Sequence, residues 1–375
     1  MQDLTHESLQ ILWRILPWAL PLYLIVAWLC LKNRKRIAPP LEVTGTWTGL
    51  HILLAFLATY LFWNIIGLTA VDALGVGKKN YPEDLVVSVK KLEVANAIDD
   101  HLATLGGGSA SFVRSREVKM TQFRLSLWAS ALIFPLQLLT IPMVLRLGNA
   151  GQPADMGLRS DRLASNLGLG VLLWLVVAPP VLVANLLFQV WYVEAVPGGP
   201  EMHPFVELCD AGLSPTELTL VILLAMIVAP CLEETLFRGL IQPWSVHHSW
   251  RRWVLLLIVL VMVIFRMIGQ LLDQWEASFV AVVDLLSPLL FLALIALVMW
   301  GMEKKAVSPR WSAIVATSAL FAFVHLAQWP SPIALFGLAL GFGWLMSRTG
   351  SLVGPILAHS LFNGIACAQM LIKYQ

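Results

Sequence analysis

Two acidic residues and one basic residue interrupt an otherwise apolar stretch at residues 218–241. Glu233 and Glu234 are adjacent, and Arg238 follows Glu234 by four residues, so in a helix Glu234 and Arg238 share one face and can form an ion pair. Glu233 points about 100° away around the helix, so Arg238 cannot serve both carboxylates equally well. Charges within a bilayer are costly and usually mark function. We therefore expect Glu233 to be available as a general base.

Two further apolar stretches carry polar residues at the same spacing. His325 follows Phe321 by four residues, and Asn363 follows His359 by four. Counted along straight helices, Glu233 and His359 lie roughly 10–12 Å below the cytoplasmic surface and His325 nearer about 20 Å, so helix tilt is needed to bring His325 level. The full set supplies the parts of a hydrolase: a base, a second group for proton transfer and donors to an oxyanion.

Each of these features alone has a simpler explanation. A Glu–Arg pair can join two helices or belong to an ion pathway, and a histidine within a membrane is usually a satisfied core residue. His359 and Asn363 can also serve as a contact between helices. The complete set favours an enzyme. The alternative is a non-catalytic membrane protein, transporter-like, bacteriocin-immunity or scaffold, that uses the same polar cavity for binding.

The elements that carry these residues are long and apolar. The 375-residue chain is 58% hydrophobic and 13% charged, whereas soluble domains are about 25% charged. A net charge of +2 and the lack of a basic, aromatic surface argue against a nucleic-acid partner. We predict an all-α, polytopic transmembrane bundle of about ten helices, with eight or nine as the alternative. The predicted spans are residues 15–31, 50–70, 125–145, 167–192, 218–241, 253–272, 281–302, 312–329, 333–347 and 352–372. The ninth is short and glycine-rich, and we expect it to be tilted, broken or only partly spanning.

Positive charge predicts how the chain is oriented. Basic residues cluster at 32–36 and recur in alternate loops, which places the N-terminus outside and those loops in the cytoplasm. We predict a plasma (inner) membrane protein with the site towards the cytoplasm. Residues 1–200 form an N-terminal transmembrane region, with an extracytoplasmic amphipathic helical loop at about 71–124. Residues 215–372 form the catalytic domain.

The chain resembles the intramembrane CAAX-protease and bacteriocin-processing family, which includes the type II CAAX prenyl endopeptidases. The family pattern is Glu-Glu-x-x-x-Arg, then Phe-x-x-x-His, then His-x-x-x-Asn or Asp. It stands here, in that order, as Glu233-Glu234…Arg238, Phe321…His325 and His359…Asn363. The resemblance covers roughly residues 218–372, and the first 200 residues have no counterpart in the minimal pattern.

The resemblance implies a glutamate-type intramembrane endopeptidase that acts on a peptide or a membrane-associated protein. Glu233 would activate a water, and His325 would orient that water and shuttle its proton. His359 and Asn363 would stabilise the oxyanion of the tetrahedral intermediate.

The remaining motif residues would support this machinery. Glu234 and Arg238 would be the pair that fixes Glu233. Zinc is the alternative cofactor, with Glu233, His325 and His359 as its ligands. We favour a mechanism without a metal or other cofactor, because the sequence lacks the His-x-x-x-His spacing of helical zinc proteases and its two histidines lie on different helices.

Overall fold

The computed structural model describes residues 46–74, 110–159, 162–195, 213–273 and 279–373, and helices are the only regular secondary structure in these ranges. Six of the described helices are long and apolar enough to cross a membrane, which makes the protein an integral, multi-pass membrane protein. They are Gly49–Ala70, Arg124–Leu147, Leu163–Tyr192, Pro215–Val246, Ser249–Gln270 and Asp284–Lys304. The predicted span 15–31 and most of the predicted amphipathic loop lie outside the described residues.

The N-terminal part of the described chain consists of three long helical rods. The first comprises α2 (Gly49–Phe56), a π-helical segment η2 (Leu57–Phe62) and α3 (Trp63–Leu74). It packs against the second rod, α5 (Ala110–Leu147), and Gln137 donates from α5 to the backbone of Thr59 at 2.9 Å. A short 3-10 turn η5 (Pro153–Met156) then leads to the third rod, α6 (Leu163–Ala195).

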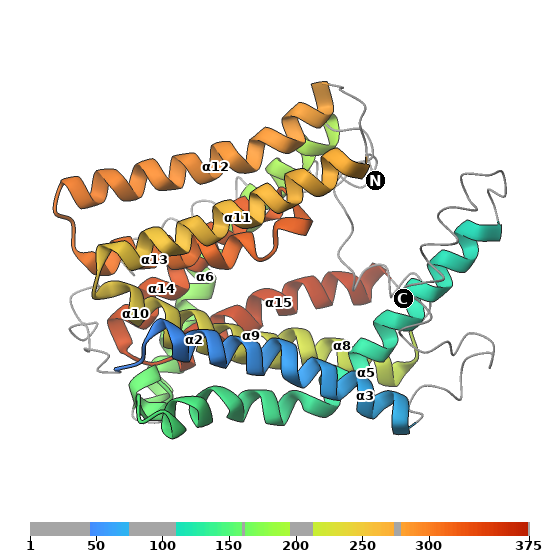
Figure 1. The fold of residues 1–375 in the computed structure, drawn as a ribbon, viewed down its shortest axis with the longest axis horizontal. Helices are drawn as coiled ribbons and strands as arrows, with labels where there is room; N and C mark the ends of the chain where they lie inside the picture. The colour runs from blue at the N-terminus through green and yellow to red at the C-terminus, as the bar shows by residue number, and fades with distance from the viewer. Residues whose placement is uncertain (1–45, 75–109, 160–161, 196–212, 274–278, 374–375) are drawn as a thin grey trace.

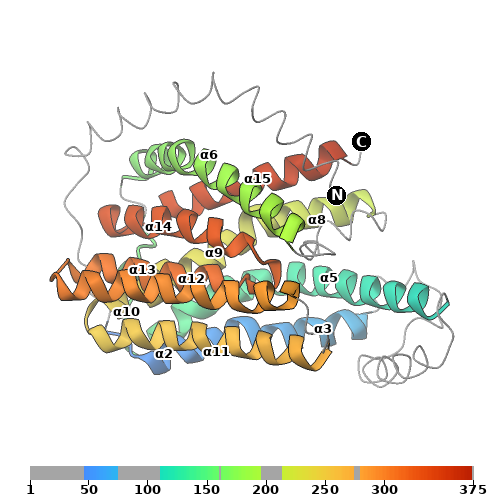
Figure 2. The same cartoon turned by 90° about the horizontal axis from the view of Figure 1, so that it is seen from above.

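Helix α6 lies against α14 (Ser331–Thr349) and α15 (Val353–Lys373), and the three occupy one side of the bundle in Figure 2. The crossing of α6 and α15 depends on glycine, because a Cβ added at Gly170 would lie 2.6 Å from the carbonyl oxygen of Gly354. Small residues allow such close approach between membrane helices. The helix that carries His359 and Asn363 is thus braced by a helix from the N-terminal region.

The central rod is the most enclosed of the six candidate spans. It runs through α8 (Pro215–Leu223), η6 (Leu224–Val228), α9 (Ala229–Glu234), η7 (Thr235–Ile241) and α10 (Gln242–Val246). In the most apolar part of this rod, 50% of the residues are buried inside the protein, whereas the corresponding share in the other five spans is 17–28%. Pro230 has no N–H for the helix ladder, and π-helical turns flank α9 on both sides, as is common at functional sites.

The remaining helices are α11 (Ser249–Asp273), α12 (Phe279–Lys304) and α13 (Pro309–Phe323). They pack against one another and run side by side in Figure 1. The prediction of one helix over residues 312–329 was wrong at its end, because α13 stops at Phe323 and only a 3-10 turn η8 (Leu326–Gln328) follows. One physical reason is the ring Nδ1 of His325, which binds the carbonyl of Phe321 at 3.0 Å in place of a continuing helical amide, while the backbone N–H of His325 binds Ala322 O. Further along, Pro330 disfavours a helical conformation at Trp329, so the helix does not resume there.

Helix α14 is unbroken over its 19 residues, although breakage was among the expectations for this glycine-rich stretch. Its glycines serve close packing instead. A Cβ at Gly341 would meet Val177 of α6 at 3.2 Å, and one at Gly343 would meet Gln242 of α10 at 2.8 Å. These glycines let α14 lie tightly between α6 and the central rod.

Candidate active site

Glu233, His325, His359 and Asn363 line one cavity of about 350 Å³. They come from α9, the break after α13, and α15. The rest of the wall is largely apolar and includes Val181 of α6, Val221, Ala225, Phe321, Leu335 and Phe362. The sequence placed His325 deeper in the membrane than Glu233 and His359, on the assumption of a straight helix. The structure removes this difference, because α13 ends at Phe323, before His325 is reached.

Glu234 is fully buried and joins two of the other motif residues. Its Oε1 accepts from Arg238 Nη1 at 3.1 Å, so the predicted ion pair is confirmed. The same oxygen lies 2.9 Å from His359 Nδ1. An ionised carboxylate can only accept, so Nδ1 of His359 carries a hydrogen. That this pair fixes Glu233 stays a prediction; besides Arg238, the side chain that Glu234 contacts is His359.

Aromatic rings enclose the two basic groups of this cluster. Arg238 Cζ lies 4.3 Å from the centroid of the Phe321 ring and 5.4 Å from that of Phe342. The ring of His359 stacks on Phe342 at 5.2 Å and meets Phe321 edge-on at 5.7 Å. The negative faces of aromatic rings attract cations, so the Phe321 and Phe342 rings stabilise the Arg238 guanidinium in an apolar interior. This contact also gives Phe321 of the second motif a physical role.

Glu233 faces the cavity and is less enclosed than Glu234, with its side chain 21% exposed against 0%. Its Oε2 is 4.0 Å from His359 Nε2, beyond hydrogen-bond distance, and has no hydrogen-bond partner among the residues that the structure describes. The different directions of the two neighbouring carboxylates follow from the turn of about 100° per residue in a helix. One carboxylate is thereby held in an ion pair and the other remains available for chemistry.

His325 and Asn363 are each oriented by a backbone carbonyl. A carbonyl can only accept, so Nδ1 of His325 donates to Phe321 O at 3.0 Å, and in the neutral ring Nε2 keeps the lone pair. Asn363 Nδ2 donates to Ala225 O at 2.8 Å, on the π-helical turn before α9. The amide nitrogen has a second hydrogen, which remains for another acceptor.

The residues that could hold a metal are not arranged as a metal centre. Among the described residues, no three His, Cys, Asp or Glu side chains are grouped closely enough to hold an ion. Nδ1 of His359 and Nδ1 of His325 are already engaged by a carboxylate and a carbonyl. We therefore derive no step through a metal, and metal independence of the activity stays a prediction.

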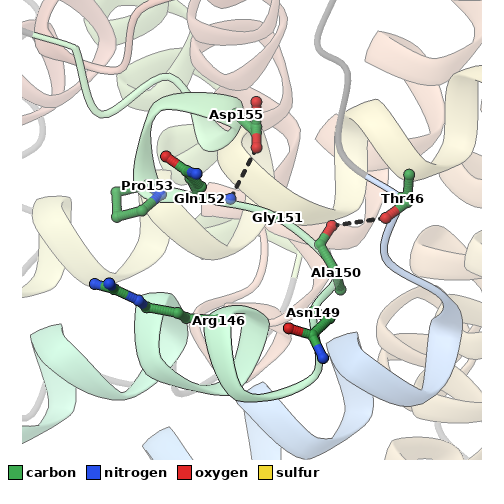
Figure 3. A pocket seen from close by; sticks show the side chains of 8 residues that line it. All are labelled: Thr46, Arg146, Asn149, Ala150, Gly151, Gln152, Pro153 and Asp155. Atoms are coloured by element: carbon green, nitrogen blue, oxygen red, sulfur yellow. Dashed lines mark hydrogen bonds between the residues drawn. The ribbon is translucent and has the colours of Figure 1, made fainter.

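A second pocket, of about 540 Å³, lies in the loop between α5 and α6 (Figure 3). It is larger than the cavity around Glu233 but contains none of the motif residues. Its one acidic side chain, Asp155, accepts from the backbone N–H of Gln152 at 2.8 Å and so caps the turn η5. Figure 3 shows Arg146 on the neighbouring helix end rather than paired with Asp155. This pocket offers no equivalent set of catalytic groups.

Sequence reasoning missed a second polar cluster, centred on Asp284 of α12. Arg266 of α11 stands within the predicted span 253–272, but the sequence alone does not identify Asp284 as its partner. The two are 18 residues apart in the chain, and no spacing rule connects residues on different helices. Phe342 was also missed, because a single aromatic residue in an apolar helix carries no signal.

The C-terminal part of the chain matches one known family. Residues 215–302 and 296–365 match the family described as type II CAAX prenyl endopeptidase Rce1-like. The matched region contains every motif residue from Glu233 to Asn363. The match confirms the resemblance for this C-terminal region. No curated protein and no solved structure matches the chain significantly.

Proposed function

With residues 215–365 assigned to the type II CAAX prenyl endopeptidase family, we propose that the protein is a glutamate-type intramembrane endopeptidase. The observation that carries this proposal is the convergence of Glu233, His325, His359 and Asn363 on one cavity. The substrate is a peptide or a membrane-associated protein, and the reaction takes place near the cytoplasmic face of the plasma (inner) membrane.

In the first step Glu233 removes a proton from a water held between its carboxylate and His325. The lone pair on Nε2 of His325 orients this water by accepting its other hydrogen. The water oxygen attacks the carbonyl carbon of the substrate, and the C=O π electrons move onto its oxygen. A tetrahedral oxyanion results, and Glu233 holds the transferred proton.

His359 and the free amide hydrogen of Asn363 are placed to stabilise that oxyanion. Nδ1 of His359 already donates to Glu234, so the ring must also carry a hydrogen on Nε2 to donate to the oxyanion. When the oxyanion collapses, the C–N bond breaks and Glu233 returns its proton to the leaving nitrogen.

The test uses full-length protein in detergent, with peptides that end in a CAAX sequence, both prenylated and unprenylated, as probes. Wild-type protein is expected to cleave at least one of them. Glu233→Gln keeps the size of the side chain but cannot accept the proton, so turnover should fall by about 10³-fold or more while peptide binding persists. Activity of the wild type should be unchanged by a chelator.

A non-catalytic membrane protein that binds through the same cavity is the competing function. It predicts that wild type and Glu233→Gln bind the peptides alike and that neither cleaves them. Equal hydrolysis by the two proteins would also rule out Glu233 as the base. Loss of hydrolysis with chelator, followed by recovery with zinc, would favour the metal mechanism instead.

A further inference from the structure

The polar cluster around Asp284 joins three membrane helices. Arg266 Nη2 on α11 lies 3.2 Å and 3.3 Å from the two carboxylate oxygens of Asp284 on α12. The same carboxylate accepts from Gln270, one turn further along α11, and from the Tyr192 hydroxyl of α6 at 2.5 Å. Asp284 therefore has a donor from each of three side chains, and the proposed reaction uses none of them.

Arg266 also contacts the helix break that carries His325. Its Nη1 donates to the carbonyl oxygen of Leu326 at 2.6 Å. Leu326 directly follows His325, and the turn closes when Gln328 N donates to His325 O at 2.9 Å. The guanidinium therefore joins the Asp284 carboxylate to the backbone next to His325.

This contact adds a second donor to a carbonyl of the turn η8. Leu326 O already accepts from Trp329 N at 3.2 Å, and Arg266 Nη1 binds the same oxygen from the side of α11. An arginine suits this place, because its planar group can bind a carboxylate and a carbonyl at once. The cost of a charge within the membrane is offset by Asp284, which is 16% exposed beside an Arg266 side chain of 18%.

We propose that Arg266, held by Asp284, is a positioning residue for His325. It fixes the turn at Leu326, so that the ring of His325 keeps its bond to Phe321 O and presents Nε2 to the cavity. This inference rests on the proposed function, because positioning matters only if His325 acts on a water. The simpler alternative is an ion pair that does no more than hold α11 to α12.

The chain contains a matched control for that alternative. Arg252 and Glu303 also join α11 to α12, with Arg252 Nε 2.9 Å from Glu303 Oε1. Arg252 likewise donates to a backbone carbonyl, that of Ser245 at 3.1 Å. This second pair is likewise an arginine with a carboxylate and joins the same helices, but Arg252 binds carbonyls of α10 instead of the turn next to His325.

The experiment compares R266M/D284L with R252M/E303L, since exchanging both partners for apolar residues leaves no unpaired charge. The first readout needs no substrate: the rate at which diethyl pyrocarbonate modifies His325, measured by mass spectrometry against His359 in the same sample. We expect this rate to rise several-fold in R266M/D284L only, because the released ring no longer donates to Phe321 O. Equal His325 rates in the two double variants would overturn the proposal.

The second readout is cleavage of the peptide that the wild type accepts. R266M/D284L should lower kcat by about 10- to 100-fold with little change in KM, as expected when a reacting group is slightly misplaced. R252M/E303L should leave kcat within about twofold. Equal loss of kcat in both would overturn the proposal. If the wild type cleaves nothing, the proposed function fails, and the modification rate still decides the positioning of His325.

Arg266→Lys provides a second route if R266M/D284L does not fold. Lysine keeps the charge beside Asp284, but its single ammonium cannot bridge the carboxylate and Leu326 O as the guanidinium does. His325 should again react faster than in the wild type while the protein remains folded. An unchanged His325 rate in this variant would contradict a positioning role.

Discussion

Two of the ion pairs within the candidate membrane spans, Glu234–Arg238 and Arg266–Asp284, form in different ways. The first is local: its partners are four residues apart on the central rod and are 0% and 1% exposed. The second joins α11 to α12 and is 16–18% exposed. Both arginines also reach a backbone carbonyl, that of Ala339 or Leu326. Each arginine therefore joins its carboxylate partner to the backbone of a further segment of the bundle.

The two ion pairs therefore act on different residues of the same cavity, one directly and one through the backbone. Glu234 touches His359 directly, so its pair acts on the candidate oxyanion site through one hydrogen bond. Asp284 acts on His325 only through Arg266 and the backbone at Leu326. We therefore expect changes in the first pair to have larger effects than equivalent changes in the second.

The largest contrast is expected between Glu234→Gln and Asp284→Asn. Glu234→Gln leaves Arg238 buried without an ionised partner, which should destabilise the protein by about 3–5 kcal/mol and lower the folded yield. Asp284→Asn leaves a more exposed arginine that keeps its bond to Leu326 O, and should cost about 1–3 kcal/mol. Thermal unfolding in detergent measures both. Equal losses would show that burial does not distinguish the pairs.

Asn363→Ala and Gln270→Ala compare the two clusters through their amide side chains. Asn363→Ala removes a candidate oxyanion donor and should lower kcat by about 10²–10³-fold with little change in KM. Gln270→Ala removes one of several donors to Asp284 and should change kcat by less than about threefold. Peptide hydrolysis per folded protein is the measurement. A loss in Gln270→Ala as large as that in Asn363→Ala would place the second cluster in the chemistry itself.

Arg238→Lys and Arg266→Lys retain charge and remove the planar guanidinium. Lysine at 238 loses the stacked geometry over Phe321 and cannot bind Glu234 and Ala339 O together, so we expect a loss of about 2–3 kcal/mol. Lysine at 266 should cost about 1 kcal/mol in stability, because solvent screening is greater there. The unfolding midpoints of the two variants compare them directly. A more stable Arg238→Lys would contradict the ranking.

The smallest effect is expected for Tyr192→Phe, which removes only the hydroxyl that donates to Asp284. Arg266 and Gln270 still satisfy the carboxylate, so the cost should be about 0.5–1.5 kcal/mol. The same unfolding assay applies. Destabilisation as large as in Asp284→Asn would make Tyr192, rather than Arg266, the main partner of the carboxylate.

Much of this molecule could be predicted from its sequence because the relevant physics is local. Apolar stretches of about 20 residues predict membrane helices without knowledge of their neighbours. The four-residue spacing of Glu234 and Arg238 places both on one helix face in any packing. The order of the three motifs predicted a resemblance, and the match of residues 215–302 and 296–365 to the type II CAAX prenyl endopeptidase Rce1-like family confirms it. The orientation, the boundaries of the two regions and the catalytic roles stay predictions.

The tertiary structure decided which helix faces meet, and sequence spacing says nothing about that. It ended α13 at Phe323 and so brought His325 to the cavity that Glu233 and His359 share. It placed His359, rather than Glu233, against Glu234. It paired Arg266 with Asp284 and laid α6 of the N-terminal region along α15. These contacts join residues far apart in the chain, and they exist only because particular side chains fit when the helices pack.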